Sequence, residues 1–281
     1  MSEKIAVLVD SGCDVPQTVI AEHRNLAVVA LNVRQNGQDY LDGVDLSPDE
    51  FYAHLTPQNL PQTASPAPTV IAAHMQDLFD AGYTKILALS ISGALSATYQ
   101  GMRLAAQAFK AGQVMVLDTK SAGIGSGLLA VYALQLIDAN QTFPDIIAAI
   151  QHSVQHSSVW LYIPSLTYLQ AGGRIGKVAG TLGSMLNIKP LLSVDDNGEI
   201  MAVGKVRSEK KAVTKLIDIA LASAGPHATI AVAHGANFKL LHDVTAQIED
   251  TGRAVAFTGS VSPAIGVHTG PGLIGVAVQN P

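Results

Sequence analysis

The chain has 281 residues, 48% of them hydrophobic and 14% charged, so it can build a substantial core as one large α/β unit or as two domains. Its formal net charge of −5, without a long basic block, gives no electrostatic footprint for nucleic acid or for an anionic membrane surface. A single cysteine, Cys13, excludes a disulfide framework and a multi-cysteine metal site.

Segments that cross or enter membranes are not indicated by the sequence. No run of about 18 apolar residues could span a bilayer. The first residues, MSEKIAVLVDSG, are typical of the first strand of a domain rather than of a signal peptide. We therefore expect a cytoplasmic protein with no stable membrane insertion.

In the first half, short apolar runs alternate with amphipathic stretches. The runs are nearly all apolar, as in strands covered on both faces. Ser47 and Glu50 form a capping box that begins one helix. This alternation predicts a parallel sheet with helices on both faces. The predicted strands are Ile5–Val9, Leu26–Val33, Ile86–Ser90 and Val114–Leu117, and the other predicted helices are Val70–Ala81, Ser96–Phe109 and Ser126–Ala139.

The second half shows a different pattern. The sequence DDNG at 195–198 separates two apolar runs and is a strong hairpin signal. An antiparallel pair inside an α/β pattern predicts a mixed sheet, so we expect two α/β domains, residues 1–158 and 159–281. The predicted strands are 159–164, 188–194, 199–206, 229–233, 254–258 and 273–278, and the predicted helices are 165–170, 208–222 and 237–249.

Three loops of the first half follow predicted strands and are rich in glycine and hydroxyl residues: 10–14, 90–100 and 118–127. Open α/β sheets bind ligands at this edge. A helix that begins near Ser96 would offer free backbone N–H groups to a carboxylate or phosphate, although Ser96 could also be a simple N-cap. Thr63 and Ser65, in a Pro-rich loop, could add hydroxyl donors, or this loop could be a stiff linker.

Two histidine arrangements are candidates for chemistry. His152 and His156 have i,i+4 spacing, but no third ligand follows and a solvated helix end is the favoured interpretation. His268 lies in IGVHTGPGLIGV, which we expect to be a tight turn that holds an anion-binding or acid–base group. Walker A, G-x-S-x-G and G-x-G-x-x-G motifs do not occur, so no cofactor is expected.

Seven ordered motifs resemble those of the DegV family and span about residues 5–278. They are DSGCD, YLDGVDLSPDEFY, LSATYQ, LTYLQAGGRIG, LNIKPLL, GEIMAVGKVR and HTGPGLIGV. The resemblance implies two α/β domains that hold one long-chain fatty acid, such as hexadecanoate, between them. It also implies that the protein is not itself an enzyme and that it presents the acyl carboxylate to a separate fatty acid kinase. We expect a monomer.

The resemblance also implies which residues bind the ligand. Thr63 and Ser96 match the hydroxyls that bond the carboxylate, and Ser92 and Gly93 match a Ser-Ser pair beside them. Arg207 and His268 match basic residues near the head group. The chain departs from the family pattern at Ala64, Gly93, Ala97 and Gly176.

The dense glycines of LQAGGRIGKVAGTLG allow two interpretations. A phosphate cradle would need a preceding strand, which is not predicted here. We expect instead that these glycines, Gly180 among them, let the backbone pass close to an acyl chain.

An alternative function remains open. The chain could be a small-molecule enzyme in which His268 or Asp10 acts as general base on a phosphorylated or acylated substrate. No Ser, Cys or Lys has a motif-defined activating base, and Cys13 is better explained as a small buried residue. The carrier interpretation is therefore favoured.

Overall fold

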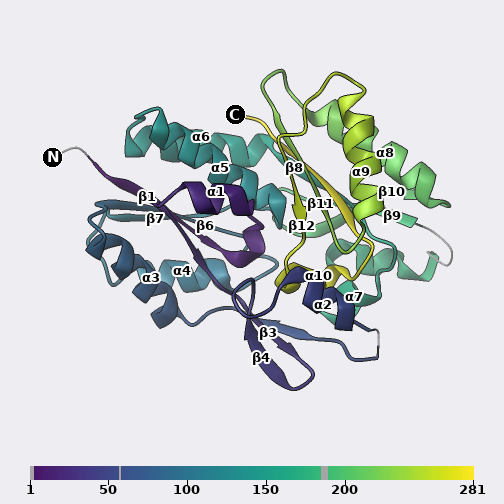
Figure 1. Cartoon of the computed structure of the whole chain (residues 1–281), viewed down its shortest axis with the longest axis horizontal. Helices are drawn as coiled ribbons and strands as arrows, with labels where there is room; N and C mark the ends of the chain where they lie inside the picture. The colour runs from purple at the N-terminus through teal and green to yellow at the C-terminus, as the bar shows by residue number, and fades with distance from the viewer. Residues whose placement is uncertain (1–2, 57, 185–188) are drawn as a thin grey trace.

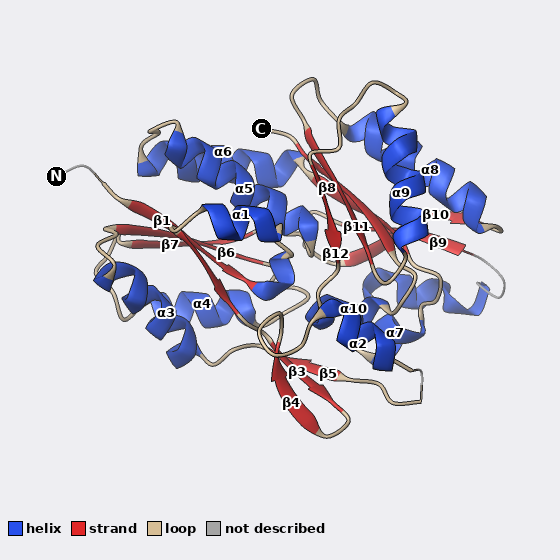
Figure 2. Cartoon of the chain, in the orientation of Figure 1, coloured by secondary structure: helices blue, strands red, loops and turns tan. Residues whose placement is uncertain are grey.

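A computed structural model describes residues 3–56, 58–184 and 189–281 of the chain. Its elements form two large sheets with helices around and between them, and a small sheet projects below (Figures 1 and 2). The predicted run Ile188–Val194 begins at a residue outside the described ranges. No helix in these ranges is both long and apolar enough to cross a membrane.

The first sheet is parallel throughout, as predicted, in the order β2-β1-β6-β7. Successive residues of β1 point to opposite faces: Val7 and Val9 pack on one side, and Ala6 and Leu8 on the other. Its strands are β1 (Ile5–Asp10), β2 (Leu26–Val29), β6 (Lys85–Ser90) and β7 (Val114–Asp118). One face is covered by α3 (Pro68–Asp80) and α4 (Thr98–Ala106), and the other by α1 (Gln17–Glu22), α5 (Ile124–Asp138) and α6 (Phe143–His156) (Figure 1).

The second sheet is mixed, as predicted, in the order β10-β9-β8-β13-β11-β12, with β11 and β12 parallel and the other pairs antiparallel. The predicted hairpin joins β9 to β10, and Asp195 Oδ1 accepts bonds from the backbone N–H groups of Asn197 and Glu199. The strands are β8 (Ser158–Tyr162), β9 (Lys189–Val194), β10 (Ile200–Val206), β11 (Thr229–His234), β12 (Phe257–Ser260) and β13 (Ile274–Gln279). Helices α8 (Glu209–Ser223) and α9 (Phe238–Glu249) cover one face.

Helix α5 joins the two cores. Nearly every residue from Ile124 to Leu134 is buried, which is the pattern of a helix enclosed on all sides. Leu129 and Leu134 pack in the core of the first sheet, whereas Ile124 and Leu128 pack against the second sheet. The two sheets are therefore connected through one shared apolar helix (Figure 1).

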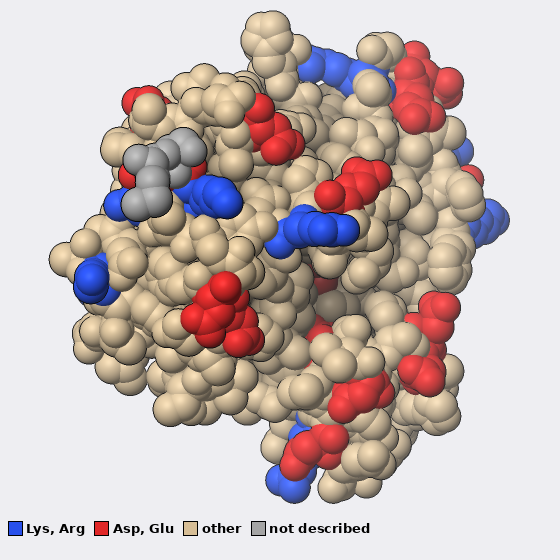
Figure 3. Space-filling view, turned by 60° about the vertical axis from the view of Figure 1, so that its left-hand side comes forward, with Lys and Arg blue, Asp and Glu red and all other residues tan. Residues whose placement is uncertain are grey.

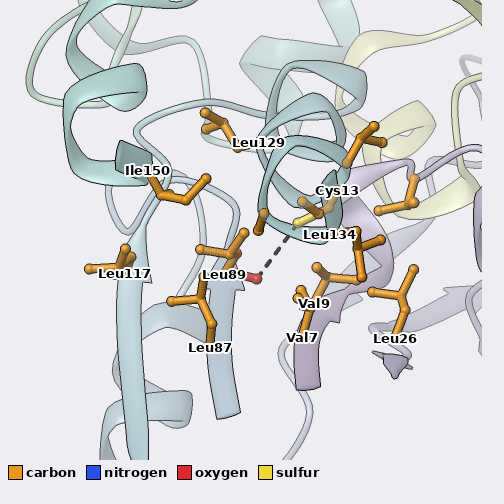
Figure 4. Close-up of a cluster of buried hydrophobic side chains, with 14 of the residues drawn as sticks. Val7, Val9, Cys13, Leu26, Leu87, Leu89, Leu117, Leu129, Leu134 and Ile150 are labelled. Carbon is orange, nitrogen blue, oxygen red and sulfur yellow. Dashed lines mark hydrogen bonds between the residues drawn. The ribbon is translucent and has the colours of Figure 1, made fainter. Parts of the chain in front are cut away.

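The core of the first sheet also contains the single cysteine. Cys13 follows β1 in a short 3-10 helix, η1 (Ser11–Cys13), and is fully buried. Figure 4 shows its sulfur among aliphatic side chains and directed at the Leu89 carbonyl oxygen, 3.9 Å away. Burial raises the pKa of the thiol well above its ordinary value, so Cys13 is a packing residue rather than a nucleophile.

The prediction of one strand over Leu26–Val33 was wrong. The chain instead forms β2 and then β3 (Asn32–Gln35), which pairs with β4 (Gln38–Leu41) and β5 (Gln62–Ala64) in a small antiparallel sheet. Asn36 and Gly37, at φ of 55° and 79°, form the β3–β4 turn. An Asn-Gly dipeptide between strands favours this turn, so the signal was present in the sequence.

The predicted tight turn around His268 was also wrong. His268 lies in the last turn of α10 (Pro263–Thr269), with Pro263 in the first turn, where the missing N–H costs least. The helix ends at Gly270, at φ of 71°. Two further short helices flank this region: the capping-box helix α2 (Pro48–His54) and α7 (Thr167–Ala171).

Candidate functional site: an apolar cavity with a polar cluster

A cavity lies between the elements of the two large sheets. The space inside it that no protein atom fills, including the part open to solvent, is about 890 Å³. Aliphatic side chains dominate the lining, among them Ile124, Leu161 and Leu273. The polar side chains of the lining are Thr63, Ser65, Ser96, Arg174, His268 and Thr269. On the face shown in Figure 3, charged side chains are scattered over a mostly uncharged surface that is hollowed near its middle.

Thr63 and His268 meet at this cavity from opposite ends of the chain. Thr63 lies on β5, and its Oγ1 shares a hydrogen bond of 2.8 Å with Nε2 of His268. Desolvation and then the charge of Arg174 lower the pKa of His268 to about 4. At neutral pH the ring is therefore uncharged. It can form hydrogen bonds, but it is only a weak base.

Ser65 and Ser96 form a second hydroxyl pair beside the first. Their Oγ atoms are 3.2 Å apart, and Ser96 Oγ also lies 2.9 Å from Thr98 Oγ1. Helix α4 begins at Thr98 with Ala97 as N-cap, so the prediction that a helix begins at Ser96 was two residues early. Ser96 Oγ still accepts a bond from the Thr98 N–H, at 3.3 Å. The hydroxyl thus lies at the start of α4, facing the cavity.

Arg174 is the charged residue among the described residues of the lining, and it was not among the predicted site residues. Its Nε donates to the Leu95 carbonyl at 3.1 Å, and its Nη1 donates to the Gly172 carbonyl at 2.7 Å. The first bond connects the glycine-rich segment after α7 with the loop that carries Ser96. A basic residue inside a glycine-rich motif was the available signal, but only the tertiary contacts show that it faces the cavity.

The surroundings of Gly172 explain why the glycine-rich segment has a glycine at this position. A Cβ atom at this position would overlap Nδ1 of His268, so the histidine ring lies directly against the glycine backbone. Gly176, at φ of 54°, similarly comes close to the backbone of Ile200. Among the described residues, none has an atom within 4 Å of a Cβ added at Gly180. The close approach is therefore to His268 and β10, and Gly180 does not share it.

Three other predicted binding residues are not among the lining residues in the described part of the chain. Ser92 is buried, and its Oγ donates to the Gly198 carbonyl at 2.8 Å, which joins the loop after β6 to the β9–β10 hairpin. The Gly93 N–H donates to Asp118 Oδ2 at 3.2 Å. Arg207 is exposed just after β10.

The candidate general base Asp10 is fully buried and likewise does not line the cavity. Its Oδ2 accepts a bond from the Ile91 N–H at 3.0 Å. Burial raises its pKa to about 6. Since Asp10 cannot reach a molecule in the cavity and His268 is a weak base, this site gives little support to the enzyme alternative.

The histidine pair on α6 has a structural explanation. The rings of His152 and His156 stack with centroids 4.1 Å apart, and His156 Nδ1 lies 2.8 Å from the His152 carbonyl oxygen. Both residues are exposed at the end of α6. Over residues 3–56, 58–184 and 189–281, no group of three or more His, Cys, Asp or Glu is arranged to hold a metal ion.

Comparisons with known proteins agree with this fold. Residues 4–280 match the family described as an uncharacterised protein family, DegV. A DegV domain-containing protein of Clostridium acetobutylicum is 32% identical over 98% of this chain and 99% of its own, and one from Deinococcus radiodurans is 34% identical over 98% of each chain.

Solved structures show the same arrangement. A DegV family protein from Thermus thermophilus, described as binding fatty acid, superimposes with a TM-score of 0.92 at 28% identity over 99% of this chain and 100% of its own. A DegV family protein from Streptococcus agalactiae, at 24% identity over 99% of each chain, has the same fold with a TM-score of 0.90. Since sequence motifs, fold and family match all extend over nearly the whole length, the chain belongs to the DegV family.

Proposed function

We propose that this protein binds one long-chain fatty acid, such as hexadecanoate, in the cavity between its two domains, residues 1–158 and 159–281. The observation that carries the proposal is the composition of the cavity wall: a mostly aliphatic lining with a few polar side chains, which include the hydrogen-bonded pairs Thr63–His268 and Ser65–Ser96. Fatty acids have the same division into an apolar chain and one polar head. The fatty-acid-binding relative from Thermus thermophilus supports the same ligand class.

The head group would be bound by Thr63, Ser96 and His268, with Ser65 beside them. The Thr63–His268 and Ser65–Ser96 contacts place these hydroxyls close together. Arg174 adds a positive charge, which favours a carboxylate over a neutral head group. The inclusion of Ser92, Gly93 and Arg207 stays a prediction, and their role would be indirect because they lie outside the lining.

Burial of the acyl chain would supply most of the affinity. Each buried methylene contributes about 0.8 kcal/mol, so roughly 14 methylenes give about 11 kcal/mol before the cost of ordering the ligand. The polar cluster would fix the orientation of the acid. Its loss would also weaken binding, because a carboxylate left without hydrogen-bond partners in an apolar cavity is costly.

The protein would act as a carrier without turnover of its own. It would present the carboxylate to a separate fatty acid kinase in the cytoplasm, and it would do so as a monomer. ATP consumption by such a kinase, measured with the loaded carrier and with free fatty acid, tests this step. Equal rates with both would contradict presentation.

Native mass spectrometry of the purified protein, followed by lipid extraction, tests the ligand itself. We expect a mass excess of one long-chain fatty acid that is lost in a Thr63→Ala/Ser96→Ala variant and kept in Thr214→Ala, which alters an exposed hydroxyl on α8. An excess that survives in the double variant would refute the head-group assignment. No excess, and no uptake of added oleate, would refute fatty acid binding.

A further inference from the structure

Helix α10 follows β12 of the second sheet, and it packs between α7 of the C-terminal half and side chains of the N-terminal half. Ala264 and Val267 pack with Leu31, Val33 and Phe51, which come from the small sheet and α2. A Cβ atom at Gly266 would lie 2.6 Å from Phe51 Cε1 and 2.7 Å from Tyr52 Oη. This close packing fixes the distance between α10 and α2.

Two carboxylates of the N-terminal half bond the beginning of α10. Asp14 Oδ1 accepts from the Ser262 N–H, and Asp42 Oδ1 accepts from the Ala264 N–H, both at 3.2 Å. The N–H groups at the start of a helix lack partners within it, so a side-chain oxygen that accepts from them there is stabilising. The side chain of Ser262, the N-cap residue, makes no capping bond of its own. The two aspartates therefore take the place of a local cap.

Asp42 is itself held in a fixed orientation. Its Oδ2 accepts a bond of 2.6 Å from Ser11 Oγ, and the same Oγ accepts from the Leu31 N–H at 3.0 Å. Asp42 is only 2% exposed. Bonds at both oxygens leave this carboxylate little freedom to follow a displaced helix.

Helix α10 lines the cavity from its first turn to its last. Ala264, Ile265, His268 and Thr269 all line it, so the residue that Asp42 bonds lies one helical turn before His268. A seven-residue helix moves as a unit, and a shift at its first turn therefore displaces the imidazole from Thr63 and Gly172.

We propose that Asp42, assisted by Asp14, is a positioning residue for the head-group site: it fixes α10 and thereby sets the place of His268 beside Thr63. The proposal rests on the proposed function for its ligand, but the position of His268 can be measured without one. Asp42 would not touch the fatty acid.

The test uses the full-length, delipidated protein, with His268 followed by NMR titration of its imidazole and assigned through His268→Gln. In Asp42→Ala, we expect the pKa of His268 to rise from about 4 toward its ordinary value because the ring becomes more hydrated. Oleate affinity should fall about tenfold, whereas affinity for oleyl alcohol, which lacks the carboxylate, should stay within about twofold.

Matched variants separate positioning from general damage. Asp42→Asn keeps an oxygen for the Ala264 N–H and should restore both readouts. Asp39→Ala removes an exposed carboxylate of the same small sheet, one that pairs with Arg34, and should change neither. A folded Asp42→Ala protein with an unchanged His268 titration would overturn the proposal.

A second variant covers the case in which Asp42→Ala does not fold. Ser11→Ala removes only the bond that orients Asp42 Oδ2 and should shift the His268 titration in the same direction by a smaller amount. An unchanged titration in Ser11→Ala would then overturn the proposal. A natural chain that binds no oleate, together with a shifted titration in the variants, would refute the proposed function while supporting the positioning role.

Discussion

Thr63 and His268 are 205 positions apart in the chain, yet their side chains share a hydrogen bond of 2.8 Å at the cavity. Thr63 comes from the small sheet of the N-terminal half and His268 from α10 of the C-terminal half. The polar end of the cavity therefore exists only when the two halves are packed together.

The titration of His268 should be visible in the pH dependence of stability. Its pKa is about 4 in the folded chain and near 6.5 when unfolded, so the unfolded chain takes up a proton first as the pH falls. The contribution of the neutral ring is present above pH 6.5 and is lost between 6.5 and 4, at most about 3 kcal/mol. Denaturant unfolding of the natural chain and of His268→Gln at several pH values measures this contribution. The free energy of unfolding should fall less between pH 6.5 and 4 in the variant. Parallel curves would contradict the lowered pKa.

Asp42 should have the opposite effect in an overlapping pH range. Burial raises its pKa from 3.8 to about 6, although bonds from Ser11 and Ala264 oppose the shift. The folded chain then holds a proton that the unfolded chain has lost, so the associated stability is full below pH 3.8 and is lost as the pH rises through 6.

Asp42→Asn removes this titration. Relative to the natural chain, the variant should gain up to about 3 kcal/mol between pH 4 and 7, measured by urea unfolding at several pH values. A difference that does not vary with pH would contradict the prediction. The charge of Asp42 is one cause of the raised pKa of Asp10, so the pKa of Asp10 should also fall somewhat in the variant.

Gly172→Ala should disturb the site through a single added methyl group. The new Cβ would overlap the imidazole of His268, and overpacking of this kind costs about 1–3 kcal/mol. We expect a lower melting temperature and weaker oleate binding. Gly180→Ala is the matched control in the same segment, because its Cβ meets no atom of the described residues within 4 Å. It should change stability by less than about 0.5 kcal/mol. Equal effects of the two substitutions would refute the contact with His268.

Gly275 should limit the space available to the acyl chain. It lies on β13 directly between Leu161 on β8 and Ala233 on β11, and all three line the cavity. Gly275→Val would fill this part of the cavity, so the protein should prefer shorter acids. The affinity for octadecanoate should fall about tenfold relative to that for dodecanoate. Mass spectrometry of competing acids measures the preference. Gly259→Val on β12, outside the lining, is the control and should leave the chain-length preference unchanged. An unchanged preference in Gly275→Val would mean that the acyl chain lies elsewhere.

The sequence by itself determined the two kinds of sheet, because the spacing of apolar residues and the composition of each segment are local properties. Uninterrupted apolar runs such as Ile5–Val9 predicted the parallel sheet, and DDNG predicted the β9–β10 hairpin. The ordered motifs also indicated the family. The small sheet could have been found from Asn36-Gly37, whose turn preference is local as well.

Only the tertiary structure decided which residues form the cavity. Arg174 and His268 both reach the cavity because the backbone of Gly172 and helix α10 lie against each other, and no spacing in the chain encodes that contact. Arg207 and Ser92 have side chains as suitable for an anion, but one is exposed and the other bonds the hairpin. The capping of α10 by Asp14 and Asp42 joins residues more than 200 positions apart, and such contacts arise from the packing of whole elements rather than from any local preference.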